Sequence, residues 1–207
     1  MYYKPRQTTA AQPKCKSGVT VLGKHFAVID TETTFSDKVM SIGVVVADTA
    51  TLEIRARAYY ILTPEYQEGG IYSFCMLERD YEIVTRAEAI QKLFCLFAAH
   101  NVTALFAYNA TFDRRHLPEF DVFDWCDIME LAAYKQTNPR IPAGTPLCRT
   151  GRLKTYNAQY MFRLLSGNDA YTEVHNALCD AEDELQIMTL LQQDLLRYPC
   201  IHHKTER

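Results

Sequence analysis

The segment from His25 to Phe35, HFAVIDTETTF, places an apolar, β-branched run directly before two carboxylates, Asp30 and Glu32. Such a run predicts a buried strand. Because residues two apart on a strand point to the same side, the two carboxylates are expected to converge where that strand ends. Adjacent carboxylates repel each other and are costly to bury unless a proton or a cation bridges them. The segment therefore predicts a strand that delivers an acid pair to a divalent-metal site.

The rest of the chain predicts a sheet with helices packed against it. Three strand-like runs at 19–31, 39–49 and 53–62 are separated by short polar connections, which favours an antiparallel meander. Periodicity and breaker residues then predict a buried strand at 102–109, helices at 86–100, 123–136, 155–167 and 177–197, and a loop at 137–152. This order indicates an α/β fold in which helices flank a mixed β-sheet.

Composition restricts the protein class. A chain of 207 residues predicts one domain, and a formal charge of −3 argues against nucleic-acid binding by bulk electrostatics alone. Seven cysteines without a CxxC pair predict reduced thiols rather than a disulfide framework or a zinc ribbon. The chain lacks a secretion-signal pattern and an apolar run of membrane-spanning length, so a soluble cytoplasmic protein with no membrane partner is expected.

Three parts of the chain are distinguished by composition. Residues 1–20 are predicted to be a flexible basic arm, 21–198 the domain and 199–207 a polar C-terminal tail. The arm either touches a phosphate backbone or is a frayed terminus that happens to be basic. Cys200, His202 and His203 suggest a metal site, but without further ligands a polar tail is the simpler interpretation.

Two further acids accompany Asp30 and Glu32. Asp113, in LFAYNATFDRRHL, is expected to open a short helix after the second buried strand, and Asp180 lies in EVHNALCDAEDEL. Each alone has a plainer explanation: Asp113 would favour a helix N-terminus, and Asp180 would belong to a solvated acidic face. Two strands ending side by side and a helix crossing them could instead bring all four carboxylates together, which suits two magnesium or manganese ions.

Together these segments resemble the DnaQ-like, or DEDDh, family of 3′-to-5′ exonucleases. The three motifs appear as FAVIDTETT, YNATFD and HNALCDA, in the family's order, within residues 26–181. The resemblance implies a ribonuclease-H-like fold, in which an antiparallel three-strand meander continues into parallel strands. It also implies two Mg²⁺ or Mn²⁺ ions, the general base His175, and the metal ligands Asp30, Glu32, Asp113 and Asp180.

The spacing of His175 and Asp180 predicts their local structure. Positions five apart in one helix diverge by roughly 140°, so both cannot face one site from the same helix. His175 is therefore expected in the loop before the helix, with Asn176 as N-cap and Asp180 one turn inside. The tyrosine branch of the family would need a tyrosine at position 176, where this chain has asparagine. A neutral histidine can accept the proton of an attacking water.

Residues in and beside the motifs are predicted to contact substrate: Thr33, Phe35 and Asn109. Phe35 stands where many relatives have glycine, and it either stacks on the terminal base or plugs the core. Tyr108 stands where a histidine is common. A basic group in or after the long loop either binds phosphates or is simply solvated, and it comprises Arg149, Arg152 and Lys154.

The function predicted from this resemblance is metal-dependent 3′-to-5′ hydrolysis of single-stranded DNA or RNA, with release of nucleoside 5′-monophosphates. The expected partner is a single-stranded nucleic-acid 3′ end. One alternative is a proofreading or repair subunit that works with a polymerase partner. Another is a non-catalytic module of the same fold that binds nucleic-acid ends.

Overall fold

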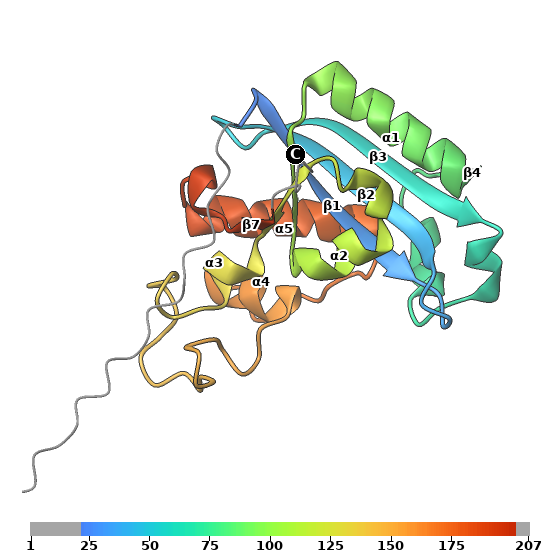
Figure 1. Ribbon diagram of the computed structural model, residues 1–207. Helices are drawn as coiled ribbons and strands as arrows, with labels where there is room; N and C mark the ends of the chain where they lie inside the picture. Colours follow the sequence, from blue (N-terminus) through green and yellow to red (C-terminus); the bar gives the residue numbers. More distant parts are fainter. Residues whose placement is uncertain (1–21, 202–207) are drawn as a thin grey trace, which may run out of the picture.

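Residues 22–201 are described by a computed structural model, and a mixed seven-stranded sheet forms their centre (Figure 1). The strands are β1 (His25–Thr33), β2 (Val39–Asp48), β3 (Ile54–Thr63), β4 (Glu82–Thr85), β5 (Ala104–Ala107), β6 (Asp124–Asp127) and β7 (Cys200–Ile201). Their order across the sheet is β4-β3-β2-β1-β5-β6-β7. The β1–β2–β3 meander is antiparallel, whereas β5 and β6 continue parallel to β1. The predicted fold class is confirmed.

Helices cover both faces of this sheet. They are α1 (Arg86–His100), α2 (Ala110–His116), α3 (Met129–Ala132), α4 (Ala158–Ser166) and α5 (Ala177–Leu191). Short 3-10 turns, η1 (Glu65–Glu68), η2 (Ser73–Glu78), η3 (Pro118–Phe120) and η4 (Leu195–Arg197), lie in the connections. Alternate residues of β1 enter different cores: Ile29 packs in the cluster that contains Phe97 of α1, and Val28 in the cluster that contains Leu185 of α5. The central strand β1 is thus buried on both faces.

Two predicted helices differ from the structure. The helix expected at 123–136 is β6 followed by the short α3, because Trp125 and Cys126 pair with β5 and a strand of four residues leaves too little periodicity to detect. The helix expected at 177–197 ends at Leu191, where Gln192 adopts a left-handed conformation. The predicted helices at 86–100 and 155–167 are confirmed as α1 and, with narrower bounds, α4.

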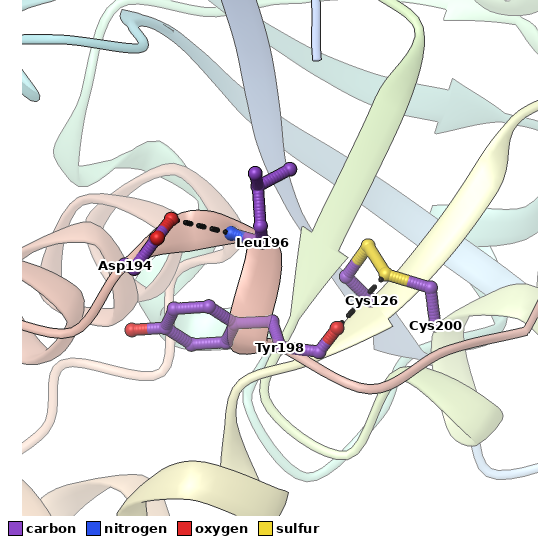
Figure 2. The surroundings of a disulfide bond; sticks show 5 residues. All are labelled: Cys126, Asp194, Leu196, Tyr198 and Cys200. Atoms are coloured by element: carbon purple, nitrogen blue, oxygen red, sulfur yellow. Dashed lines mark hydrogen bonds between the residues drawn. A yellow bond between two sulfur atoms is a disulfide. The ribbon is translucent and has the colours of Figure 1, made fainter. Parts of the chain in front are cut away.

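The prediction that the cysteines are reduced is wrong for one pair. Cys126 and Cys200 form a disulfide (Figure 2). They are 74 residues apart in sequence but direct register partners on β6 and β7, so no short-range spacing could reveal them. The same pairing corrects the predicted tail, because Cys200 and Ile201 belong to the sheet.

The predicted arm at 1–20, together with His202 and His203, lies outside the described residues. Within residues 22–201, no helix has both the length and the apolar character needed to cross a membrane.

Candidate active site

Asp30 and Glu32 lie near the end of β1 and point to the face of the sheet that α5 covers. Asp30 stands opposite Gly43 of β2 in the strand register, and Glu32 stands opposite Ser41. Glu32 is only 9% exposed, and Asp30 is partly buried. The predicted convergence of the two carboxylates on one side of the strand follows from the two-residue period of the strand.

The start of α5 is fixed against the sheet by a buried cap. The Asn176 side-chain oxygen accepts hydrogen bonds from the backbone N–H groups of Leu178 (3.2 Å) and Cys179 (3.3 Å). Its amide nitrogen donates to the Tyr59 hydroxyl at 3.1 Å and to the Cys75 carbonyl at 2.9 Å. The predicted N-cap is confirmed, and because it is fully buried it determines where the first turn of α5 lies.

Asp113 reaches the site from the side of β1 where β5 lies, opposite to β2. It lies in the first turn of α2, which follows β5 as predicted, and it is 2% exposed. Its Oδ1 accepts a hydrogen bond from the Thr31 hydroxyl at 2.8 Å. Thr31 stands between Asp30 and Glu32 in β1, so this bond ties α2 to the strand that carries the acid pair.

The four predicted acids lie close enough to perturb one another. Burial, with the nearby Asp113 carboxylate, raises the pKa of Asp30 well above its usual value. Burial and the neighbouring Glu173 raise the pKa of Glu32 to about 8 and that of Asp180 to about 9. Burial raises the pKa of Asp113 to about 7. Without cations, the site therefore holds protons at neutral pH.

The acid cluster fits divalent cations. Among residues 22–201, the ion pairs made by lysine and arginine involve none of the four acids. Asp180 Oδ1 is buried without a hydrogen-bond partner within the same range. Carboxylate oxygens are ligands that suit Mg²⁺ and Mn²⁺, and a bound cation would supply the missing partner.

His175 lies at the edge of the acid cluster. It precedes the Asn176 cap with a left-handed φ of 59°, so it stands in the loop before α5 as predicted. His175, Glu32 and Asp180 each contribute one possible ligand atom, and these three atoms lie within 4.8 Å of one another. Burial lowers the pKa of His175 below its usual value, which favours the neutral imidazole. The ring stacks on Tyr72 with centroids 3.8 Å apart.

Three site residues were absent from the sequence prediction: Tyr72, Glu173 and Glu184. Glu173 Oε2 lies 4.0 Å from His175 Nδ1, and burial raises the pKa of Glu173 to about 7. Glu184 follows Asp180 by four residues, so helical spacing could have placed both on one face of α5. Tyr72 comes from an irregular segment before η2, where sequence carries no periodic signal.

The three predicted substrate contacts differ in exposure. Phe35 is 76% exposed, so its interpretation as a core plug is wrong. Thr33 ends β1 and is partly buried, whereas Asn109 is exposed and donates its backbone N–H to Asp127 Oδ1 at 3.2 Å. Contact of these three residues with substrate stays a prediction.

The other departure from the family pattern, Tyr108, contacts the loop before α4, near the predicted basic group. The Tyr108 hydroxyl donates to the Tyr156 carbonyl, so Tyr108 braces this loop. The Arg152 guanidinium lies over the Tyr156 ring, 3.8 Å from its centroid. Arg149 and Lys154 are exposed.

Comparison with known proteins places this arrangement in a fold family. No protein-family description and no curated protein matches the sequence. Among solved structures, the nuclease domain of 3′hExo, a DEDDh family member bound to rAMP, matches with a TM-score of 0.60 and 14% identity over 87% of this chain and 97% of that chain. A full-length 3′-exonuclease matches with a TM-score of 0.57 and 13% identity over 89% of this chain and 92% of that chain. The chain has the DEDDh exonuclease fold.

A third matching structure belongs to a longer chain. Exonuclease I of E. coli, in complex with a 5cy-dT13 oligonucleotide, matches with a TM-score of 0.55 and 12% identity over 82% of this chain. The match covers 40% of the Exonuclease I chain. The likeness at these identities shows the fold and confirms the predicted ribonuclease-H-like architecture.

Proposed function

We propose that this protein is a metal-dependent 3′-to-5′ exonuclease that hydrolyses single-stranded DNA or RNA and releases nucleoside 5′-monophosphates. One observation carries the proposal: four buried or partly buried carboxylates, none of them in an ion pair with a lysine or arginine of the described residues, lie together with His175 in the DEDDh fold. The proposed metal ligands are Asp30, Glu32, Asp113 and Asp180. The 3′hExo and Exonuclease I structures, which contain rAMP and an oligonucleotide, support a nucleic-acid substrate.

The carboxylates bind two Mg²⁺ or Mn²⁺ ions in this proposal. Bound ions would stabilise the negative charge that develops on the attacking and leaving oxygens during in-line displacement at phosphorus. Because burial raises the pKa of these acids, their protons must leave when cations bind. Metal binding should therefore strengthen as pH rises.

His175 acts as the general base. Its neutral imidazole accepts a proton from the water that attacks the terminal phosphodiester, and its lowered pKa keeps the acceptor form available at neutral pH. The stack on Tyr72 fixes the plane of the ring. The Glu173 carboxylate, 4.0 Å from Nδ1, favours the imidazolium that forms when the proton arrives.

Residues beyond the four acids hold the 3′ end of the nucleic acid in this proposal. Phe35, with its exposed ring, stacks on the terminal base, and such stacking tolerates any sequence. Thr33 and Asn109 contact the sugar and phosphate of the terminal nucleotide. The predicted polymerase or repair partner is a separate proposal, which co-purification with the tagged protein would test.

The test is time-resolved cleavage of 5′-labelled single-stranded DNA and RNA with Mg²⁺, Mn²⁺ or chelator. Wild type should give a metal-dependent ladder that shortens from the 3′ end, and His175→Ala should lose it. His100→Ala is the matched control, because His100 ends α1 and contacts His25 at the opposite end of β1 from the acids. Binding without cleavage under any metal would favour the non-catalytic module.

A further inference from the structure

Glu184 adds a buried carboxylate beside the four acids of the sequence motifs. It lies on α5 four residues after Asp180, which places both side chains on the same face of the helix. The side chain is 3% exposed. The carboxylates of Asp113 and Asp180 repel the Glu184 carboxylate, which in turn repels that of Asp30. Its charge therefore falls within the cluster rather than on a solvated face of α5.

This carboxylate lacks the partners that normally accompany a buried acid. Buried charges in proteins are paired or bound to metal, and buried polar atoms are hydrogen-bonded. Glu184 accepts a hydrogen bond from the backbone of Tyr108, yet Oε2 has no partner among residues 22–201. No lysine or arginine of that range forms an ion pair with it.

A neighbouring acid on the same helix shows the usual arrangement. Glu182 forms ion pairs with Arg57 at 2.5 Å and with Arg79 at 2.9 Å. The helix thus neutralises an acid away from the site with arginine, whereas the acid that faces Asp30 and Asp113 has no basic partner within the described chain. A divalent cation in the cluster would supply that partner.

We propose that Glu184 takes part in divalent-cation binding together with Asp30 and Asp113, as a fifth acidic residue of the metal site. This inference rests on the proposed function, since it assumes that the cluster binds metal. It assigns to Glu184 a role that the three sequence motifs do not include. Removal of its charge should weaken the hold on a hard divalent cation, because each carboxylate ligand contributes to affinity for such ions.

The experiment measures Mn²⁺ binding to the full chain by calorimetric titration and by the shift in Tm that Mn²⁺ produces. Wild type, Glu184→Gln, Glu184→Asp and the control Glu182→Gln are compared at one pH. Glu184→Gln should raise the Kd for Mn²⁺ at least about tenfold and reduce the Tm shift, while its metal-free Tm is not lowered. Glu182→Gln should bind Mn²⁺ like wild type.

The outcomes separate this inference from the proposed function. Wild-type affinity in Glu184→Gln, with tight binding by wild type, overturns the role of Glu184 alone. A wild type that binds no Mn²⁺ overturns the proposed function and this role with it. If Glu184→Gln does not fold, Glu184→Asp carries the same test, because it keeps the charge and withdraws the carboxylate by one methylene. Unchanged affinity in that variant would then count against the inference.

Discussion

Gly43 sets how closely the start of α5, which carries Asp180, packs against the sheet that carries Asp30 and Glu32. It stands opposite Asp30 in β2, where the first turn of α5 crosses the sheet. A Cβ at this position would lie 2.1 Å from the Ala177 carbonyl carbon and 2.2 Å from the Leu178 nitrogen. Both neighbours are backbone atoms, so a rotamer change cannot relieve the contact. Gly43→Ala must push the start of α5 away from β2 by about 1 Å or more.

This displacement should damage catalysis more than folding. Overpacking of this kind costs about 1–3 kcal/mol of stability. His175 and Asp180 flank the displaced turn, and a misplacement of about 1 Å can lower a rate about 100-fold. We expect Gly43→Ala to reduce single-turnover cleavage of a labelled oligonucleotide about 100-fold or more, with a loss of unfolding free energy in urea within the stated range.

Gly144→Ala is the matched control. An added Cβ there has no neighbour within 4 Å, but the φ of 83° makes any side chain costly. Strain of this kind costs about 1–2 kcal/mol, so the control should lose stability and keep its cleavage rate. Wild-type activity in Gly43→Ala, or an equal loss of activity in both variants, would show that the position of the first turn of α5 does not limit catalysis.

Three further predictions concern the acids and the disulfide. Asp30→Asn should abolish turnover yet raise the unfolding free energy measured in urea with chelator, because a buried, repelled carboxylate is removed; retained turnover would contradict its role. The chelated wild type should lose stability as pH rises from about 5 to about 9. In the folded state the pKa values of Glu32 (about 8) and Asp180 (about 9) lie above their unfolded values, so the folded state binds more protons than the unfolded state. A Tm that rises across this range would contradict the assignment. Reduction of Cys126–Cys200 should lower the unfolding free energy by about 4 kcal/mol and leave cleavage intact, as measured by urea unfolding and oligonucleotide assays with and without dithiothreitol; equal stability in both would argue against the crosslink.

The parts of the site that sequence predicted are those governed by local rules. The two-residue period of a strand places Asp30 and Glu32 on one side, and the helical period separates His175 from Asp180. Asn176 follows from the preference for a side-chain oxygen at a helix start. Each rule acts over a few residues, so the sequence alone contains the information needed.

The features that sequence missed depend on long-range contacts. Trp125 belongs to a strand because β6 pairs with β5. Cys200 lies next to Cys126 because β7 pairs with β6. Tyr72 stacks on His175, although it lies in a segment before η2 that has no regular structure. Tertiary pairing of this kind overrides local propensity and leaves no periodic pattern in the chain.

In the proposed reaction, the acid cluster and His175 direct water to the phosphorus of the terminal phosphodiester. Cleavage of a single-stranded oligonucleotide in ¹⁸O-labelled water with Mn²⁺, followed by mass spectrometry of the products, tests it most directly. Attack by water at phosphorus should place one ¹⁸O atom in each released nucleoside 5′-monophosphate and none in the shortened strand, and Asp30→Ala should give no product. Internal fragments, or ¹⁸O at the 3′ end of the remaining strand, would contradict it.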